Sequence, residues 1–379
     1  MPVTRIGVLG FRNLVHQELE PAEGITLLWG PNGAGKTNVL EALCVALAGR
    51  SCRTRKHREA IAFGESLARV EVQLRDGPDT REMLWSLSQA GERRHLVDGN
   101  EVAAEHAELR PALAVFLPDR LALVKGPPGV RRAHLDRLCA ALWPARAESR
   151  RRYSRALAQR NALLARTRVG GASRESLDAW EWELASAGVE LAAARRDAVA
   201  ALAPEFTTCA AELGLAGEPE LRYVPRSDAA DAGELAAELR SRREMDLARG
   251  HTTHGPHLDD LALSAGGRPL RRYGSQGEQR AALLALLFAE RRAFLAARRA
   301  PPLMLLDDVM SELDAERRQR LARRLAVGGG QAVLTATEPS QLPIDCERTE
   351  LAMERGEVNA VRTPNAEATV EAAGAVLAA

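Results

Sequence analysis

The sequence is poor in cysteine, lysine and aromatic residues. Its 379 residues include five cysteines without a Cys-x-x-Cys or other paired metal-ligand spacing, so we expect reduced thiols and no structural zinc site. It contains no apolar run of membrane-spanning length and no signal-peptide core, which predicts a cytoplasmic protein without a membrane partner. Lysine occurs at Lys36, Lys56 and Lys125, although Lys and Arg together number 52. The formal net charge of +1 neither implies nor excludes a nucleic-acid partner.

One of these lysines lies in a glycine-rich segment that matches the phosphate-binding pattern GxxxxGK[ST]. The segment follows an apolar run, 25–29, and precedes a helix-like run, 37–48. Its residues are Gly30, Pro31, Asn32, Gly33, Ala34, Gly35, Lys36 and Thr37. Glycines let successive backbone N–H groups face a phosphate, and the helix start adds the positive end of its dipole. We therefore predict an ATP site in which Lys36 contacts the β- and γ-phosphates and Thr37 holds Mg²⁺.

A pair of acids completes the pattern of a nucleotide site. Four apolar residues, 303–306, precede Asp307 and Asp308, as expected for a buried parallel strand that ends in carboxylates. This Walker B pattern assigns Asp307 to the metal and Asp308 to the attacking water. This pattern alone is weak evidence for a nucleotide site, since many strands end in an acid, but it is strong evidence in a chain that also contains a phosphate-binding loop.

A third motif precedes a long predicted helix at 276–299. Ser275 and Glu278 form an S-x-x-E capping box, flanked by Gly274 and Gly277, so helix-terminal N–H groups are open to a ligand. The segment resembles the LSGGQ-type signature of ABC ATPases, in which the signature of one subunit completes the ATP site of another. That resemblance implies a catalytic role for Ser275, Gln276 and Gly277. Ser311-Glu312-Leu313-Asp314 fits the D-loop, and Thr337 is a hypothetical substitute for the switch histidine.

Strands and helices alternate at both ends of the chain, while the middle is helical. We predict strands at 3–11, 25–29, 68–74, 81–88, 93–97, 112–116, 258–263, 303–306 and 331–335, and a helix at 314–325. These motifs predict an α/β P-loop head of ABC-ATPase type with an inserted helical lobe. The expected division is 1–129 and 251–358 for the ATPase lobe, 130–250 for the helical lobe, and 359–379 for a flexible tail.

The helical section contains a heptad-like seam. Its positions, spaced alternately by three and four, are Leu177, Trp180, Leu184, Ala187, Leu191, Ala194, Ala198 and Ala201. An earlier helix carries Tyr153, Leu157 and Leu164, which predicts a short antiparallel coiled-coil arm. That helix also carries arginines between 146 and 168; a solvated face is the favoured interpretation, and a DNA or protein contact is the alternative. The basic segment 50–58 could equally be a solvated loop or a phosphate-backbone contact.

The chain resembles the RecF family of ABC/Rad50/SMC-type ATPases. The blocks that carry this resemblance are Phe11-Arg12-Asn13, GPNGAGKTN ending at Asn38, LALVKGPPGVRRAHLD (121–136), HGPHLDDL (254–261), YGSQGEQR (273–280) and LLDDVMSELD (305–314). They extend over nearly the whole chain, and the VKGPP and HGPH blocks make the match specific. By matching position, Arg12, Asn13 and Asn38 would lie near the nucleotide.

The resemblance also implies a function in recombination, DNA replication, DNA repair and the SOS response. It implies an ATP-dependent homodimer with slow hydrolysis, which binds single-strand/double-strand junctions and gapped DNA. It further implies RecR and RecO as partners that promote RecA loading.

Three other functions are alternatives to a RecF-type function in DNA repair. A nucleotide-binding subunit of a membrane transporter would have a much shorter helical insert between Lys36 and Ser275. An SMC-like structural tether would need a longer arm with a hinge domain. A module that holds ATP without turnover remains open, since an Asp at the position of Asp308 could activate water more weakly than the Glu usual in relatives.

Overall fold

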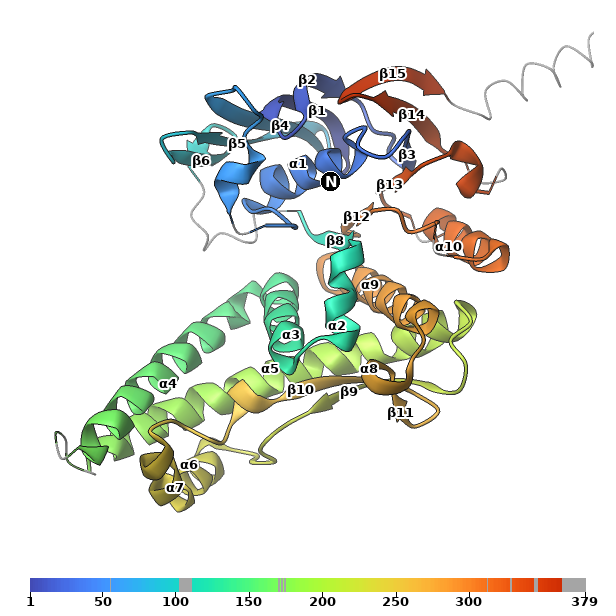
Figure 1. The fold of residues 1–379 in the computed structure, drawn as a ribbon. Coiled ribbons are helices and arrows are strands. Elements are labelled where there is room, and N and C mark those ends of the chain that lie inside the picture. Colours follow the sequence, from blue (N-terminus) through green and yellow to red (C-terminus); the bar gives the residue numbers. More distant parts are fainter. Residues whose placement is uncertain are drawn as a thin grey trace, which may run out of the picture. The chain divides into compact units, whose positions relative to one another are not determined.

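A computed structural model gives the structure of the chain. It describes residues 1–54, 56–101, 111–169, 171, 173, 175–311, 313–327, 329–343 and 347–362. The expected tail from residue 363 and Glu312 of the expected D-loop lie outside these residues. The chain forms two compact units: unit 1 takes in Met1–Arg120, Glu212–Gly214 and the chain from Phe294 onward, and unit 2 takes in Leu121–Ala211 and Leu215–Ala293. Each unit is drawn in Figure 1.

A largely parallel six-stranded sheet positions the phosphate loop in unit 1. Its order is β15-β14-β3-β13-β12-β8, with every neighbour pair from β14 to β8 parallel and β15 antiparallel. The strands are β3 (Ile25–Trp29), β8 (Leu113–Phe116), β12 (Leu303–Leu306), β13 (Ala332–Ala336), β14 (Thr349–Glu354) and β15 (Glu357–Arg362). Because parallel strands share one carboxyl edge, the ends of β3 and β12 bring the phosphate loop to Asp307.

An antiparallel sheet of order β2-β1-β4-β5-β6-β7 forms the other layer of unit 1. Its strands are β1 (Val3–Phe11), β2 (Leu14–Leu19), β4 (Leu67–Asp76), β5 (Asp79–Ser88), β6 (Arg93–Val97) and β7 (Asn100–Glu101). Helix α1 (Lys36–Ala48) is buried along most of its length, and one apolar cluster joins it to both sheets. Hydrophobic burial on two sides therefore fixes the helix that begins at the phosphate loop. Unit 1 also contains α10 (Ala315–Val327).

Unit 2 is mainly helical and holds a small antiparallel sheet, β11-β10-β9. Its helices are α2 (Ala122–Lys125), α3 (Pro128–Leu142), α4 (Ala147–Arg168), α5 (Ser176–Glu212), α6 (Ala232–Ser241), α7 (Arg243–Arg249), α8 (Leu270–Tyr273) and α9 (Gln276–Arg298), the ends of α5 and α9 falling in unit 1. Its strands are β9 (Pro219–Val224), β10 (Asp260–Ala265) and β11 (Arg268–Pro269). Short 3-10 helices lie at His57–Ala60, Pro118–Leu121, Pro144–Arg146, Pro256–Leu258 and Pro339–Gln341.

The heptad-like seam on α5 packs against α4, as expected for the arm. Leu184, Ala187 and Leu191 share an apolar cluster with Tyr153. The last position differs from the prediction, because Ala201 is exposed and Leu202 is buried in its place. A straight helix drifts relative to a strict 3.5-residue repeat, which moves the buried face by one residue near the end of the seam.

Two further features differ from the sequence-based expectations. Strands β2, β9, β14 and β15 were not predicted, and β9 lies in the section expected to be helical. Residues 251–293 group with the helical unit 2, whereas the expected division assigned them to the ATPase lobe. The assignment of functional lobes stays a prediction. Among the described residues, no helix is long and apolar enough to cross a membrane.

Candidate nucleotide-binding site

The phosphate loop leads directly into the first turn of α1. Gly35 is the N-cap residue at φ 105°, and Gly33 has φ 82°, values that residues with a Cβ rarely adopt. In this described segment α1 has no side-chain cap and no acid in its first turn. The N–H groups of the turn are therefore available to an anion, with the helix dipole in support.

Lys36 lies within the curve of the loop. Its Nζ donates to the carbonyl oxygens of Gly30 and Pro31 at 2.6 and 2.9 Å, and the residue is 9% exposed. Burial lowers the pKa of Lys36, while the nearby carboxylates of Asp308 and Asp307 act in the opposite direction. These contacts keep the ammonium group close to the loop amides and the acids at the end of β12.

The two acids after β12 are held by threonine hydroxyls. The Oδ1 atom of Asp307 accepts hydrogen bonds from Thr37 and Thr335, each at 2.8 Å. Thr335 also accepts from the backbone N–H of Asp308 at 2.8 Å. The backbone of Asp308 has φ 48°, and its buried Oδ1 has no hydrogen-bond partner among the described residues. Such an acceptor is available to a water molecule or another ligand of the site.

Thr335 is the residue that sequence reasoning missed. It lies in β13 and is 1% exposed, and it connects the backbone of one acid to the carboxylate of the other. A polar residue within the apolar run of β13 was the available signal. Thr337, the expected switch residue, donates its backbone N–H to Gln341 at 3.1 Å, and its proposed role remains a prediction.

Polar side chains from the turn after β1 lie beside the loop. Asn13 donates to the carbonyl oxygen of Gly33 at 3.0 Å and accepts from Asn38 at 2.7 Å. Arg12 donates to both carboxylate oxygens of Glu41 in α1, at 3.1 and 2.8 Å. Asn13 and Asn38 thus contact the phosphate loop or each other, whereas the guanidinium of Arg12 is engaged by Glu41.

Burial alone would raise the pKa of Glu41. Hydrogen bonds from Arg12 and Ser51 outweigh this effect, so the pKa of Glu41 lies below its ordinary value. Glu41 is therefore an ionised acceptor that holds Arg12 against α1.

The signature-like segment in unit 2 forms the predicted capping box. Glu278 accepts from the backbone N–H of Ser275 at 2.7 Å, and Ser275 accepts from the N–H of Glu278 at 3.2 Å. Ser275 and Gln276 are exposed at the start of α9. A hollow of about 340 Å³ in the same unit is lined partly by Tyr273 and Glu278. This helix start therefore presents Ser275 and Gln276 on the surface of unit 2.

Comparison with known proteins identifies the family. The family model described as "RecF/RecN/SMC N terminal domain" matches residues 2–358. The DNA replication and repair protein RecF of Anaeromyxobacter sp. (strain Fw109-5) is 40% identical over 349 residues, which cover 89% of this chain and 93% of the relative. The chain belongs to the RecF family.

Solved structures agree with this assignment. A structure described as the recombination mediator protein RecF with ATP, in the RecFOR pathway, aligns with TM-score 0.82 and 27% identity, covering 94% of this chain and 97% of that one. An Smc head domain with an extended coiled coil, from Pyrococcus furiosus, aligns with TM-score 0.61 and 15% identity over 97% and 98% of the two chains. The expected α/β head of ABC-ATPase type is thereby confirmed as the fold of this RecF-family chain.

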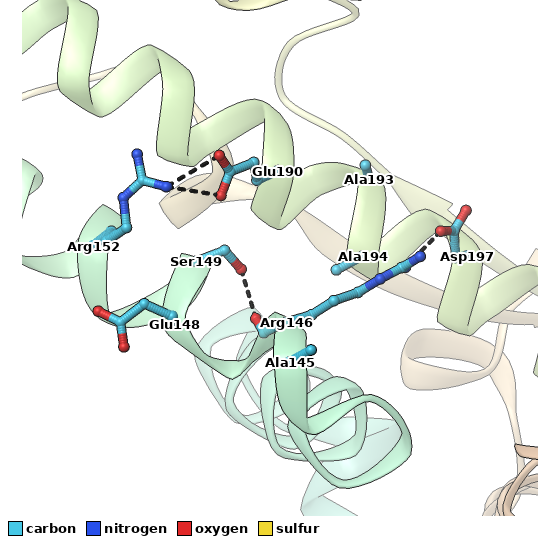
Figure 2. A pocket seen from close by; sticks show the side chains of 9 residues that line it. All are labelled: Ala145, Arg146, Glu148, Ser149, Arg152, Glu190, Ala193, Ala194 and Asp197. Carbon is cyan, nitrogen blue, oxygen red and sulfur yellow. Dashed lines mark hydrogen bonds and ion pairs between the residues drawn. The ribbon is translucent and has the colours of Figure 1, made fainter. Parts of the chain in front are cut away.

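The arginines of α4 in this RecF-family chain are largely paired with acids. Arg146, directly before α4, contacts Asp197 at 2.7 Å, and Arg152 of α4 contacts Glu190 at 3.1 Å, around a hollow of about 410 Å³ (Figure 2). The acids lie on α5, so the two helices neutralise each other's charges across the hollow. This pairing favours a solvated, ion-paired face over a phosphate-binding stripe.

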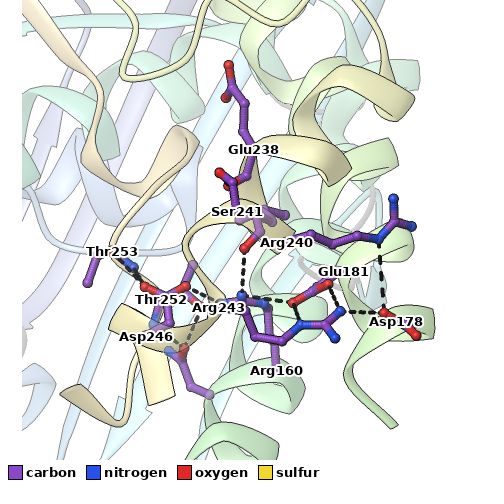
Figure 3. Close-up of polar contacts among 12 residues, drawn as sticks. Arg160, Asp178, Glu181, Glu238, Arg240, Ser241, Arg243, Asp246, Thr252 and Thr253 are labelled. Carbon is purple, nitrogen blue, oxygen red and sulfur yellow. Dashed lines mark hydrogen bonds and ion pairs between the residues drawn. The ribbon is translucent and has the colours of Figure 1, made fainter. Parts of the chain in front are cut away.

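One arginine of α4 has a buried, structural position. Arg160 is 0% exposed and donates to Asp246 at 2.7 Å, Glu181 at 3.0 Å and Thr252 at 2.8 Å (Figure 3). Arg243 adds a second guanidinium against Glu181. The network joins α4, α5, α7 and the segment before the histidines, and so fixes the helices of unit 2.

The histidines of the HGPH block have protein partners. His254 contacts Glu238 at 2.6 Å, and His257 contacts the hydroxyl of Tyr153 at 2.7 Å. Burial lowers the pKa of His257. No group of three or more His, Cys, Asp or Glu residues suited to a metal occurs in the described part of the chain. The block thus joins α6, α4 and the strand that follows it.

Proposed function

We propose that this chain is an ATP-dependent DNA-binding protein of recombinational DNA repair and replication-fork maintenance. Its activity would be a slow, DNA-stimulated hydrolysis of ATP to ADP and phosphate. The observation that carries the proposal is the 2.8 Å contact between Thr37 at the end of the phosphate loop and Asp307 at the end of β12. It joins the phosphate-binding and acidic motifs in one site, within a chain that belongs to the RecF family.

Each residue of the site has a proposed role. Lys36 and the loop amides would bind the β- and γ-phosphates, and Asn13 and Asn38 would hold the loop in shape. The Thr37 hydroxyl and the Asp307 carboxylate are oxygen ligands of the kind that Mg²⁺ takes beside nucleotide phosphates, so the residues fit this ion. Bound Mg²⁺ would neutralise charge that develops on the phosphates. The unpartnered Oδ1 of Asp308 would orient the attacking water.

A second copy of the chain would complete the site. Helix α9 begins at Gln276, directly after Ser275. The exposed Ser275 and Gln276 and the partly exposed Gly277 are suited to contact a γ-phosphate held by another molecule. ATP would then join two heads, and hydrolysis would release them. This arrangement makes ATP occupancy a conformational gate.

For the DNA contact we propose the basic ridge of unit 1, defined as Arg53, Lys56, Arg58 and Arg93. Arg93 contacts His57 at 3.3 Å, which places the segment after α1 against β6. The side chain of Lys56 is 83% exposed. Exposed cations of this kind bind the phosphate backbone without reading sequence. Within the ridge, Arg53 contacts Glu41 at 3.2 Å and Lys56 contacts Glu59 at 3.7 Å. The exposed Arg58 and Arg93 have no carboxylate partner among the described residues. The ridge is favoured over the arm because more of the arginines on the arm are paired with acids.

The proposed partners follow from the relatives. The solved relative is described as a recombination mediator of the RecFOR pathway, which supports RecR and RecO as partners and RecA as the protein that is loaded. Gapped DNA and single-strand/double-strand junctions are the proposed substrates. Such a role implies a cytoplasmic location.

The nucleotide proposal is tested by Lys36→Met, with Lys125→Met as the matched control. Lys125 is an exposed lysine of α2 in unit 2, so its loss should leave the site unchanged. We expect Lys36→Met to abolish ATP binding measured by calorimetry, while the control binds like wild type. Undiminished ATP affinity in a folded Lys36→Met protein would remove the basis of the proposal.

The DNA proposal is tested by charge reversal at two places. Lys56→Glu with Arg58→Glu removes charge from the ridge, and Arg151→Glu with Arg155→Glu does so on the arm. We expect the ridge variant to bind gapped DNA more weakly, with a salt dependence reduced by roughly one unit of log–log slope for each lost phosphate contact. If the arm variant loses affinity and the ridge variant does not, DNA binds on the arm.

A further inference from the structure

The hairpin of β14 and β15 lies against the phosphate loop. Strand β14 pairs in parallel with β3, the strand that leads into the loop (Figure 1). The backbone of Met353 lies so close to Gly30 that a Cβ on this glycine would come within 2.1 Å of the Met353 carbonyl oxygen. In the turn of the hairpin, the N–H of Gly356 donates to the carbonyl oxygen of Ala34 at 2.9 Å. The hairpin therefore contacts the loop at its first glycine and again at Ala34.

The hydrogen bond from Gly356 fixes the direction of one N–H group of the loop. The carbonyl of Ala34 and the N–H of Gly35 belong to the same planar trans peptide unit, in which they point in opposite directions. Because the carbonyl is directed at the hairpin, the N–H of Gly35 is directed away from it. Gly35 is the N-cap residue of α1, so this N–H lies next to those of the first helical turn. The bond thus orients a donor of the anion site without touching the anion.

The turn also packs tightly against the residue that holds the neighbouring carbonyl of the loop. The side chain of Asn13 donates to the carbonyl oxygen of Gly33 at 3.0 Å. The backbone of the same Asn13 lies against the turn, because a Cβ on Gly356 would come within 2.2 Å of its carbonyl oxygen. That distance is far shorter than any contact a side chain tolerates, and the obstructing atom belongs to the backbone. A side chain at residue 356 would therefore displace the turn from the loop.

A second turn of the same kind separates the contact with the loop from the needs of the turn itself. Arg355 and Gly356 form a two-residue turn with φ 51° and 89°, as type I′ requires. Asp98 and Gly99 form the matching turn between β6 and β7 in the same unit, with φ 50° and 78°. A Cβ on Gly99 would meet no atom of the described residues within 4 Å. The two glycines thus share a conformation, and only Gly356 contacts the phosphate loop.

We propose that Gly356 is a positioning residue of the ATP site. Its N–H holds the carbonyl of Ala34, so that the N–H of Gly35 can donate to a phosphate of the nucleotide. The inference rests on the ATP site proposed above and adds the C-terminal hairpin to the parts that shape it. Because coupling between two contacts is reciprocal, ATP bound to the loop strengthens the contact between the loop and the hairpin.

The experiment compares Gly356→Ala with the matched control Gly99→Ala in the full chain. Both variants should be less resistant to chemical denaturation, since alanine at a positive φ is strained. We expect Gly356→Ala alone to bind ATP more weakly in calorimetric titration, by roughly 10-fold, as for the loss of one hydrogen bond of the site. Wild-type affinity in folded Gly356→Ala, or equal losses in both variants, would overturn the positioning role. A wild-type chain that binds no ATP would refute the ATP site itself and this inference with it.

Amide hydrogen exchange in the wild-type chain gives a second test, which holds even if Gly356→Ala does not fold. Saturation with ATP and Mg²⁺ should slow exchange in the loop, residues 30–37, and at the N–H of Gly356, and should leave the turn at Gly99 unchanged. Slower exchange in the loop with unchanged exchange at Gly356 would show that ATP binds without the hairpin contact, and would overturn the proposal.

Discussion

Replacement of Thr335 by valine tests how the two acids of the site are held. The change keeps the shape of the side chain and removes the hydroxyl, which donates to Asp307 and accepts from the N–H of Asp308 at 2.8 Å each. A hydrogen bond to a charged group contributes about 1.5–3 kcal/mol, and a buried donor left without a partner costs about 1–3 kcal/mol. Together these terms predict that Thr335→Val lowers the free energy of unfolding by about 2.5–6 kcal/mol.

The same substitution should act on the nucleotide. Asp307 would lose one of its two hydroxyl donors, and loss of such a supporting contact typically weakens a metal site by about 10-fold to 100-fold. We therefore expect Thr335→Val to reduce the affinity for ATP in the presence of Mg²⁺ far more than in the presence of EDTA. Calorimetric titration with ATP under both conditions measures this difference, and chemical denaturation measures the loss of stability.

Two matched variants separate the site from general packing. Thr335→Ser keeps the hydroxyl and should retain most of the Mg²⁺-dependent affinity. Thr26→Val removes a buried hydroxyl in β3 that accepts from the N–H of Ala22 at 2.9 Å, so it should lower stability without a Mg²⁺-specific effect. If Thr335→Val binds Mg²⁺-ATP like Thr26→Val does, Thr335 does not position Asp307.

Two further predictions concern buried charges. Arg160→Leu leaves the buried carboxylates of Glu181 and Asp246 without the guanidinium of Arg160, and should lower the free energy of unfolding by about 3–5 kcal/mol. The control Arg151→Leu, on the surface of α4, should change the free energy of unfolding little. Equal small effects of both variants in chemical denaturation would refute the structural role of the network. The pKa of Glu41 is lowered in the folded state, so the ionised Glu41 stabilises the fold above pH 4.5, the ordinary pKa of the residue, and this stabilisation is lost as the pH falls through the folded pKa. Glu41→Gln should flatten this part of the pH–stability curve. An unchanged curve would contradict the assignment of Glu41 as an ionised acceptor.

Local patterns were enough to predict several elements in both units. The phosphate loop, the strand before Asp307 and the capping box at Ser275 are contiguous in sequence, and the structure shows each of these local elements. The consecutive apolar residues of β3 and β12 also predicted that these strands are buried on both faces, because a strand with one face in solvent would alternate apolar and polar residues. The family resemblance was likewise confirmed, because its blocks extend over nearly the whole chain.

Long-range partners explain what could not be predicted. The sequence around α4 contains many arginines and few acids, so its positive charge looks uncompensated. The structure pairs Arg146 and Arg152 with Asp197 and Glu190, which lie on the next helix, α5. Thr335 gained its role through β13 lying beside β12, a pairing that no local pattern specifies. The β9 strand is short and depends on pairing with β10, so its helix-rich surroundings concealed it.

The central claim is that an ATP site is completed by the signature of a second molecule, and mixing two inactive variants tests it most directly. Lys36→Met would remove ATP binding but keep Ser275, while Ser275→Arg would keep ATP binding but block the contact in trans. In a mixed pair, the phosphate loop of the second variant would face the intact signature of the first. We predict that ATP turnover with gapped DNA is negligible for each variant alone and returns on mixing. Substantial turnover by Ser275→Arg alone, or none in the mixture, would contradict the claim.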